Sequence, residues 1–175
     1  TLNQYGFNAP TVEQIIQNID NESGKQFYST SGYRLTKDRL YLIVDKPESP
    51  IDKLLISEND KEIAEPIQLK INRFTPSNAF VFSKDKNHVH LDASKLQFPL
   101  ELRLWQAGDV FCPLGMTQTK KLSDFFIDIK LSRPEKEQTW VILSRGEIVW
   151  IVGQRLDDRF KITDETTEIL ELYYE

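Results

Sequence analysis

Apolar and polar residues alternate along much of the second half of the chain. From residue 65 on, apolar side chains recur at every second position in several short segments. A period of two is typical of a β-strand with one buried face. The segments with this alternation are residues 67–71, 89–91, 100–104 and 168–174, and short continuous apolar runs occur at 79–82, 140–143 and 148–152. Ser144-Arg145-Gly146-Glu147 separates two of them and predicts a β-hairpin.

The first half of the chain contains one helical pattern followed by three short strand patterns. Residues 11–20 carry apolar side chains with the spacing of one buried helical face, and Thr11 with Gln14 predicts a capping box at the start. A small β-meander is expected to follow at residues 27–30, 33–36 and 39–44. Residues 47–50 read Pro-Glu-Ser-Pro and are the best linker candidate in the chain.

A second helix is expected after a turn-rich loop near residue 110. Its apolar residues Leu122, Phe125, Phe126 and Ile129 follow the i, i+3, i+4, i+7 spacing of a buried helical face. We expect the helix to begin near Thr119, which can act as an N-cap.

These patterns together predict an α+β fold. We expect a mostly antiparallel sheet, or a β-sandwich-like core, covered by one or two short helices. The 175 residues suffice for one core, or for one core with a smaller attached piece. The linker candidate predicts a division into residues 1–46 and 61–175, joined by 47–60. Alternatively, the early helix packs onto the later sheet and the whole chain forms one domain.

Two lysines stand where the second helix is expected to begin. A start near Thr119 places Lys120 and Lys121 in the first turn, where the helix dipole disfavours cations. Free backbone N–H groups beside two ammonium groups can bind an anion, phosphate above all. The simpler interpretation is that both lysines are solvated and that Lys120 reaches Asp124 one turn on.

Composition and charge limit the possible classes of function only weakly. Hydrophobic residues make up 39% and charged residues 28%, as in an ordinary globular protein, and no apolar run is long enough to span a bilayer. The net charge is −5, but residues 162–175 contain five acidic and no basic residues. The rest of the chain is therefore nearly neutral, which permits RNA binding without demanding it. The first residue, Thr1, predicts that the chain is a fragment of a longer protein.

Several short motifs occur in a recognisable order. They read Gly108-Asp109, Pro113-Leu114-Gly115-Met116, Lys120-Lys121-Leu122-Ser123-Asp124-Phe125-Phe126 and Gly153-Gln154-Arg155-Leu156-Asp157, after a lead-in of Leu91-Asp92-Ala93-Ser94-Lys95-Leu96 and Pro99-Leu100. This series closely resembles the C-terminal domain of the tRNA(Ile)-lysidine synthetases. The resemblance covers residues 89–163 well and the first hundred residues more loosely. The chain departs from the family pattern at Trp105, Ala107, Val110 and Gln118.

The resemblance implies a part of a larger enzyme. The parent would be a cytoplasmic ligase that uses ATP and Mg²⁺ to couple lysine to the wobble cytidine of tRNA(Ile). Residues 1–46 would end its substrate-binding domain, and residues 61–175 would form its C-terminal tRNA-recognition domain, which holds the acceptor-stem side. The Ser-Gly-Gly-x-Asp-Ser nucleotide loop of the family does not occur in these 175 residues, so we expect no catalytic residue and no cofactor here. The expected partners are tRNA(Ile) and a second copy of the parent, with no membrane.

Basic residues in and near the motifs are the candidate phosphate contacts. If residues 155–161 are extended, Arg155, Arg159 and Lys161 share one strand face and can follow a phosphate backbone. The three tryptophans lie in strand patterns and are expected to pack in the core. The complete candidate set is Lys120, Lys121, Lys130, Arg133, Arg155, Arg159 and Lys161.

Other residue clusters have simpler interpretations. His88 and His90 share a strand face with Asp92, a combination that can bind a metal, but an exposed strand face is the favoured interpretation. A hydrolase built on these three residues is disfavoured. Cys112, the single cysteine, is expected to be a buried or half-buried thiol.

Two further hypotheses concern carboxylates and the class of function. Asp157 and Asp158, interleaved with arginines, are expected to form surface ion pairs of little energetic weight. The alternative function is a structural, protein-interaction or dimerisation domain without direct RNA contact. An exposed apolar patch around Phe125 and Phe126 would favour that alternative.

Overall fold

The computed structural model describes residues 1–20, 24–46, 53–76, 83 and 85–175. The chain forms two compact units. Unit 1 comprises Thr1–Pro50 and Lys130–Gln138, and unit 2 comprises Ile51–Ile129 and Thr139–Glu175. The apolar run predicted at 79–82 lies outside the described residues. Within the described part of the chain, no helix is long and apolar enough to cross a membrane.

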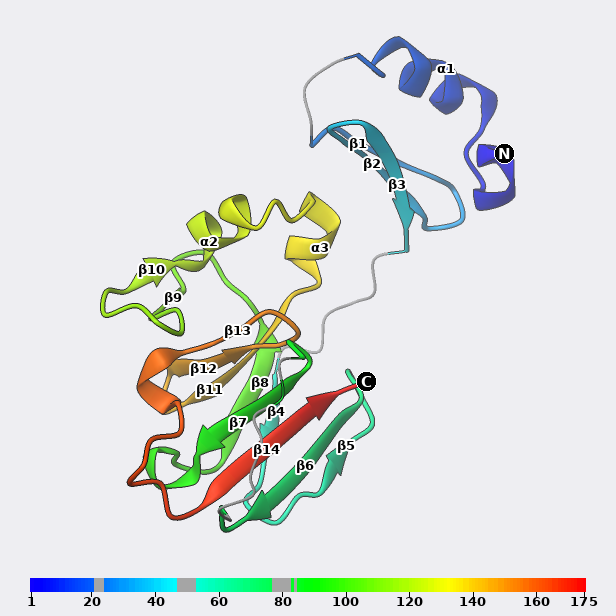
Figure 1. Ribbon diagram of the computed structural model, residues 1–175. Helices are drawn as coiled ribbons and strands as arrows, with labels where there is room; N and C mark the ends of the chain where they lie inside the picture. Colours follow the sequence, from blue (N-terminus) through cyan, green and yellow to red (C-terminus); the bar gives the residue numbers. More distant parts are fainter. Residues whose placement is uncertain (21–23, 47–52, 77–82, 84) are drawn as a thin grey trace. The chain divides into compact units, whose positions relative to one another are not determined.

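Unit 1 contains the predicted meander as an antiparallel sheet of order β1-β2-β3 (Figure 1). Its elements are η1 (Leu2–Tyr5), α1 (Ala9–Gln17), β1 (Gln26–Tyr28), β2 (Arg34–Asp38), β3 (Tyr41–Asp45) and α3 (Arg133–Glu137). Phe7, Ile15, Phe27 and Leu35 form its buried core. Because Ile15 lies on α1 and Leu35 on β2, the apolar face of the helix packs against the sheet.

The helix α1 begins two residues earlier than predicted. Asn8 is its N-cap, and the Asn8 side chain accepts a hydrogen bond of 3.0 Å from the backbone N–H of Thr11. The capping box expected from Thr11 and Gln14 was therefore wrong. Pro10 explains the shift, because proline fits the first turn of a helix, where its missing N–H costs nothing.

The short helix α3 was not predicted and belongs to unit 1. Ser132 and Glu135 form a capping box at its start. Arg34 on β2 donates to Asp45 on the neighbouring strand and also pairs with Glu137 of α3. The guanidinium of Arg34 thus joins the meander to a helix about a hundred residues away in the chain.

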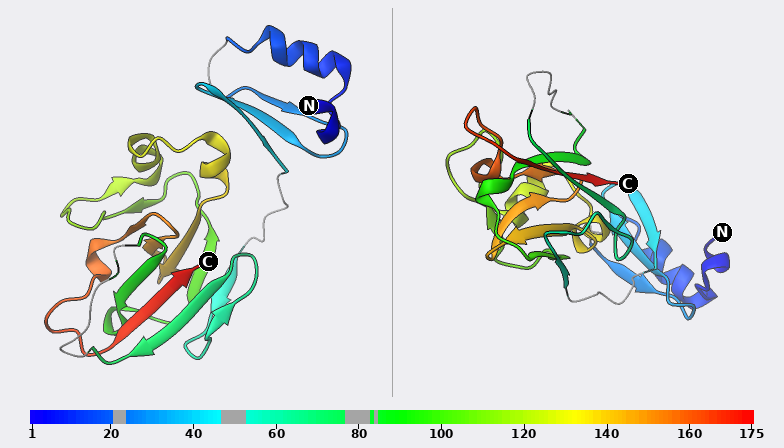
Figure 2. Two further views of the ribbon diagram at one scale, coloured as in Figure 1. Left: turned by 45° about the vertical axis from the view of Figure 1, so that its right-hand side comes forward. Right: turned by 90° about the horizontal axis from the view of Figure 1, so that it is seen from below.

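Unit 2 is built from two larger antiparallel sheets and a two-stranded ribbon (Figures 1 and 2). The strand orders are β13-β12-β11-β8-β4, β5-β6-β14-β7 and β10-β9. The strands are β4 (Leu54–Ile56), β5 (Glu62–Ile63), β6 (Leu69–Phe74), β7 (His88–Asp92), β8 (Leu100–Leu104), β9 (Val110–Phe111), β10 (Lys120–Lys121), β11 (Trp140–Ser144), β12 (Glu147–Ile151), β13 (Arg155–Leu156) and β14 (Ile169–Tyr174). The helical elements are η2 (Ala93–Lys95), α2 (Leu122–Asp128) and η3 (Asp158–Phe160).

The main core of unit 2 lies between its two larger sheets. Inward side chains of the four-stranded sheet, such as Leu91 and Leu172, belong to the same buried cluster as Leu102, Ile142 and Trp150 of the five-stranded sheet. All five of these side chains are almost completely inaccessible to solvent. The unit is therefore the predicted sandwich-like core of mostly antiparallel strands.

The other face of the five-stranded sheet is also buried. Val141 and Ile151 are register partners on β11 and β12, and both are fully buried although they point away from Ile142 and Trp150. On this side of the sheet lie α2 and the ribbon β9–β10 (Figure 1). Phe126 of α2 is fully buried. The second predicted helix thus provides a third layer.

Two further features concern the predicted connections. The hairpin between β11 and β12 is confirmed, and its turn residues Arg145 and Gly146 have φ of 51° and 79°. Two left-handed residues in succession match the twist of the flanking strands. The strand β4 falls within residues 47–60, which were expected to be a linker, and it pairs with β8.

Candidate nucleic-acid interface

The loop that contains the first two sequence motifs is tied to residues 156–158. The backbone N–H of Cys112 donates to the side chain of Asp157 over 2.8 Å, and the N–H of Gly115 donates to Asp158 over 2.8 Å. Pro113 and Asp157 also form a β-bridge. We call residues 110–116 and 153–161 together the interlocked loops. Motifs about forty residues apart in the chain are thus one structural element.

Asp157 is a fully buried anchor of the interlocked loops. Its two carboxylate oxygens accept hydrogen bonds from the Cys112 N–H and from the backbone N–H, Nε and Nη2 of Arg159. Arg159 also pairs with Glu147, and hydrogen bonds to Asp157, stronger than the opposing effect of burial, raise the pKa of Arg159. The expectation of a weak surface ion pair was therefore wrong for Asp157, because its side chain is 0% exposed.

Cys112 is buried, as predicted. Its thiol donates to the backbone carbonyl of Met116 over 3.0 Å. Burial raises the pKa of the Cys112 thiol, and the negative charges of Asp157 and Asp158 raise it further. A neutral buried thiol is a poor nucleophile, so Cys112 serves the packing of the loop.

Lys120 and Lys121 lie in a strand and not in the first turn of a helix. Lys120 pairs with Phe111 and Lys121 with Val110 across the ribbon β9–β10, and α2 begins only at Leu122. The predicted helix start at Thr119 was wrong, because strand pairing holds both lysines in extended backbone. Lys121 is the N-cap of α2, so this lysine alone of the two lies at the helix start.

The two lysines of β10 differ in their partners. Lys120 forms an ion pair with Asp128, the last residue of α2, and not with Asp124. Lys121 is exposed and has no ion-pair partner among the described residues. Only Lys121 therefore presents a charge that a neighbouring carboxylate does not already neutralise.

The three cations after residue 154 do not share a strand face. The strand β13 ends at Leu156, and η3 intervenes between Arg155 and Lys161. Lys161 pairs with Asp158 through Nζ at 2.9 and 3.0 Å. The predicted cationic row was therefore wrong, since the backbone turns at Asp157, the N-cap of η3. In the described part of the chain, Arg155 has no ion-pair partner.

Two candidate residues belong to unit 1. Lys130 has φ of 59°, and its backbone carbonyl accepts a hydrogen bond from Arg39. Arg133 pairs with Glu137 and donates to the carbonyl of Gly24. Lys130 and Arg133 thus belong to a different unit from the other five candidates.

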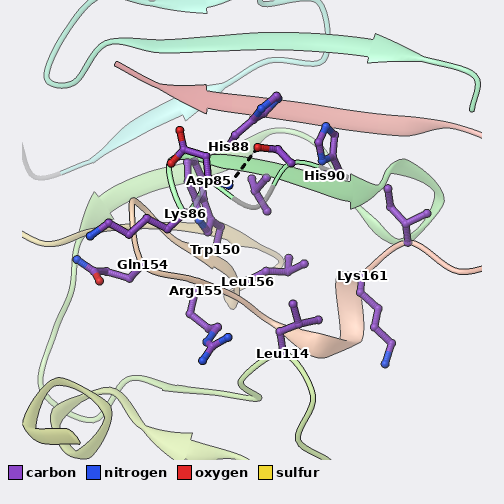
Figure 3. Close-up of a pocket in the computed structure, with 13 residues that line it drawn as sticks. Asp85, Lys86, His88, His90, Leu114, Trp150, Gln154, Arg155, Leu156 and Lys161 are labelled. Atoms are coloured by element: carbon purple, nitrogen blue, oxygen red, sulfur yellow. Dashed lines mark hydrogen bonds between the residues drawn. The ribbon is translucent and has the colours of Figure 1, made fainter. Parts of the chain in front are cut away.

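A pocket of about 530 Å³ lies beside the interlocked loops (Figure 3). Arg155, Lys161 and Lys86 are the basic residues among its described lining residues, and Asp85 is the acidic one. Trp150 lines it from β12. Other described lining residues are Gln154, Leu114 and Leu156 from the interlocked loops, with His88 and His90 from β7. Because Asp158 neutralises Lys161, Arg155 and Lys86 are the cations that leave the described lining residues with a net positive charge.

Arg155 is directed away from the strand that bears the histidines. Figure 3 shows the His88 and His90 rings on the side of β14, whereas the side chains of Arg155 and Lys161 project on the other side of β7. Lys86 was missed by the sequence reasoning, because it stands outside every motif and no strand or helix periodicity includes it. Its position two residues before β7 was the one available signal.

Family models match both units of the chain. The model of the TilS substrate binding domain matches residues 1–47, and that of the TilS substrate C-terminal domain matches residues 100–172. A tRNA(Ile)-lysidine synthase of Parabacteroides distasonis is 42% identical over 170 residues, which are 97% of this chain and 39% of that protein. The chain belongs to the tRNA(Ile)-lysidine synthase family.

Another tRNA(Ile)-lysidine synthase, from Bacteroides thetaiotaomicron, is 37% identical over 99% of this chain and 38% of its own length. The chain thus spans about 39% of the length of the curated relatives it matches. A crystal structure titled as the TILS C-terminal domain superposes with a TM-score of 0.54 at 18% identity, covering 70% of this chain and 89% of the other. This likeness establishes a shared fold.

The matched C-terminal range of the tRNA(Ile)-lysidine synthase family contains the interlocked loops completely. The motifs on which the sequence resemblance rested are therefore the residues that contact one another in unit 2. Of the seven candidate cations, four are ion-paired within the chain: Lys120, Arg133, Arg159 and Lys161. Lys121, Lys130 and Arg155 have no ion pair among the described residues.

Proposed function

We propose that this chain is the tRNA-binding C-terminal part of an ATP-dependent tRNA(Ile)-lysidine synthase. The parent enzyme would join lysine to the wobble cytidine of tRNA(Ile), and this part would supply RNA affinity and not catalysis. ATP and Mg²⁺ would bind elsewhere in the parent. Family membership and the names of the relatives support the parent activity. The electropositive pocket supports the RNA role.

The observation that carries the RNA role is the position of Arg155. Its guanidinium has no ion pair among the described residues, although Arg159 and Lys161 nearby are both neutralised by aspartates. An arginine can bind a phosphate through two parallel N–H groups. Lys86 lines the same pocket and would add positive potential to such a contact.

The interlocked loops would keep Arg155 in place for this contact. Leu156, the next residue, accepts a backbone hydrogen bond from Leu114, and β13 pairs with β12. Because hydrogen bonds on two sides already restrict this backbone, less conformational entropy is lost when a ligand immobilises the Arg155 side chain. Arg155 should therefore contribute more to affinity than a lysine on a free loop would.

Lys121 and Lys130 are the next contacts that we propose. Both are unneutralised among the described residues, whereas a phosphate that binds Lys120, Arg133, Arg159 or Lys161 must compete with a carboxylate of the chain itself. In the double variant with Lys120→Ala and Lys121→Ala, the loss of Lys121 should therefore account for most of the effect.

The test is salt-dependent binding of duplex RNA with the acceptor-stem sequence of an isoleucine tRNA. Each phosphate contact that is lost lowers the slope of log affinity against log salt by about 0.7 to 0.9. We expect Arg155→Ala and Lys121→Ala each to weaken binding and to flatten this slope. Lys61→Ala is the matched control, since Lys61 is an exposed lysine beside β5, at the opposite edge of the sheet from β7.

Equal slopes for Arg155→Ala, Lys121→Ala and Lys61→Ala would contradict the assignment of these contacts. If the chain itself does not bind the duplex at low salt, the same variants are compared in the full-length enzyme. Unchanged tRNA affinity there would refute the RNA role.

Phe125 and Phe126 do not form the exposed apolar patch that would favour the alternative role as an interaction domain. Phe125 is 7% exposed and Phe126 is fully buried, so neither contributes to an apolar patch. Their rings pack within unit 2, where Phe126 contacts Trp105 edge-on at 5.0 Å and Phe125 contacts Phe111 at 5.1 Å. The apolar face of α2 is thus used for the core.

A further inference from the structure

Two histidines and a glutamate converge on the outer face of the four-stranded sheet. Glu171 on β14 is the register partner of His90 on β7, and His88 lies two residues along the same strand. The Nε2 atoms of His88 and His90 lie 2.8 and 3.1 Å from the same carboxylate oxygen, Oε1 of Glu171. One ligand atom from each residue falls within 4.8 Å of the other two.

From this geometry we propose that His88, His90 and Glu171 form a binding site for a divalent transition metal ion, Zn²⁺ in the first place. Ligand atoms at about 2.0 to 2.1 Å around a tetrahedral zinc lie about 3.3 Å from one another. The two nitrogen–oxygen distances are within a few tenths of an ångström of that separation. Small rotations of the imidazoles therefore open a position for the ion, with solvent at the fourth ligand position.

The donor set selects the class of ion. Two imidazole nitrogens with one carboxylate oxygen suit zinc and its neighbours among the transition metals. Mg²⁺ and Ca²⁺ prefer sites made of oxygen atoms alone. The identity of His88 and His90 therefore argues for Zn²⁺ over the Mg²⁺ that accompanies ATP.

The surroundings hold the carboxylate and one imidazole in place. The second oxygen of Glu171 accepts a hydrogen bond of 3.2 Å from Asn72 on β6. The His90 side chain is 5% exposed, and Tyr173 packs edge-on against His88 at 5.6 Å. Groups that orient ligands in this way raise the affinity of metal sites.

The carboxylate of this site is not the one that the sequence suggested. Asp92 shares the strand face with the histidines, but its oxygens accept from Ser94 and Thr166, and Lys95 lies 3.6 Å away. The carboxylate of Asp92, the last residue of β7, is thus already hydrogen-bonded to other groups. The third ligand comes instead from β14, about eighty residues later in the chain.

The experiment is zinc binding to the whole 175-residue chain without an affinity tag. His88 and His90 are the only histidines of the sequence, so any histidine-dependent binding reports on this site. We expect one zinc ion per chain by elemental analysis after dialysis, and a rise in Tm on the order of 5 °C at saturating Zn²⁺. Replacement of zinc by Co²⁺ should give the absorption spectrum of a tetrahedral site.

Variants distinguish this site from adventitious binding. His88→Gln is the main variant, because the ring is partly exposed and its loss should leave the fold intact. We expect His88→Gln and Glu171→Gln each to lower zinc affinity by at least about 100-fold, and Asn72→Ala, which only frees the carboxylate, by about 10-fold. Glu168→Gln is the matched control, as a partly exposed glutamate just before β14 that pairs with Arg73 and not with the histidines.

Equal zinc affinity in the unchanged chain and in His88→Gln would overturn the proposal. So would the absence of saturable zinc binding by the folded chain at neutral pH. Neither outcome depends on RNA binding, so the metal site and the tRNA role can fail separately.

Discussion

Asp157→Asn tests whether the interlocked loops depend on a buried carboxylate. Asp157 accepts four hydrogen bonds, two at each oxygen, and one of each pair comes from a backbone N–H of Cys112 or Arg159. Asparagine keeps one oxygen, so one backbone donor and one guanidinium donor lose their acceptor in either orientation of the amide. The side chain is fully buried, so water cannot replace the lost acceptor.

The size of the effect follows from these contacts. The unpaired buried backbone N–H costs about 1 to 3 kcal/mol. The guanidinium of Arg159 is 40% exposed and can be rehydrated, so its lost bond adds only about 1 kcal/mol. We therefore expect Asp157→Asn to lower the free energy of unfolding of unit 2 by about 2 to 4 kcal/mol.

Urea unfolding followed by tryptophan fluorescence measures this quantity. All three tryptophans, Trp105, Trp140 and Trp150, lie in unit 2, so the signal follows that unit alone. Asp158→Asn is the matched control. Its side chain is 19% exposed and binds the N–H of Gly115 and Lys161, so we expect a loss of about 1 kcal/mol or less. Equal losses for the two variants would refute the role given to the buried carboxylate.

Three further predictions concern other groups. Burial lowers the pKa of His90 below its ordinary 6.5, and hydrogen bonds from both histidines and Asn72 outweigh burial to lower the pKa of Glu171 below 4.5. The unfolded chain therefore takes up more protons at both sites than the folded chain does. The metal-free unit 2 should lose stability as the pH falls through 6.5 and then through 4.5. Urea unfolding at a series of pH values, with EDTA present, measures this loss. Cys112 should react with iodoacetamide far more slowly in the native chain than in urea, by mass spectrometry, because burial raises its pKa. Arg34→Ala should destabilise unit 1 by about 3 kcal/mol, since it leaves the carboxylate of Asp45 unpaired; hydrogen exchange in β2 and β3 measures the loss.

The longer strands of unit 2, namely β6, β7, β8, β11, β12 and β14, could be predicted because each carries its own signal. The continuous apolar runs around Ile142 and Trp150 mark two strands, and Arg145-Gly146 marks the turn between them. Each of these signals spans only a few residues, so it can be recognised in the sequence without knowledge of the fold. The apolar spacing of α2 was recognised for the same reason, through Leu122 and Phe126.

The errors arose where a distant partner decides the local structure. Lys121 is extended because it pairs with Val110, eleven residues earlier, and the helical pattern next to it gave no sign of this. Asp157 is buried because the loop around Cys112 covers it. Likewise, the meeting of His90 with Glu171 depends on the register between β7 and β14, which no local pattern encodes. Short sequence periodicities locate single helices and strands. The sites around Lys121, Asp157 and His90 depend instead on which strands and loops pair with one another.

The position of β14 in its sheet has a consequence for the biosynthesis of the protein. The strands β6 and β7 are not hydrogen-bonded to each other, and β14 pairs with both of them. During translation, therefore, β6 and β7 emerge from the ribosome long before the strand that joins them. The four-stranded sheet cannot close until residues 169–174 have left the exit tunnel, and until then β6 and β7 lack the strand that pairs with both of them. A chain that ends before Ile169 would lack this strand and should be degraded instead of accumulating as a shortened protein.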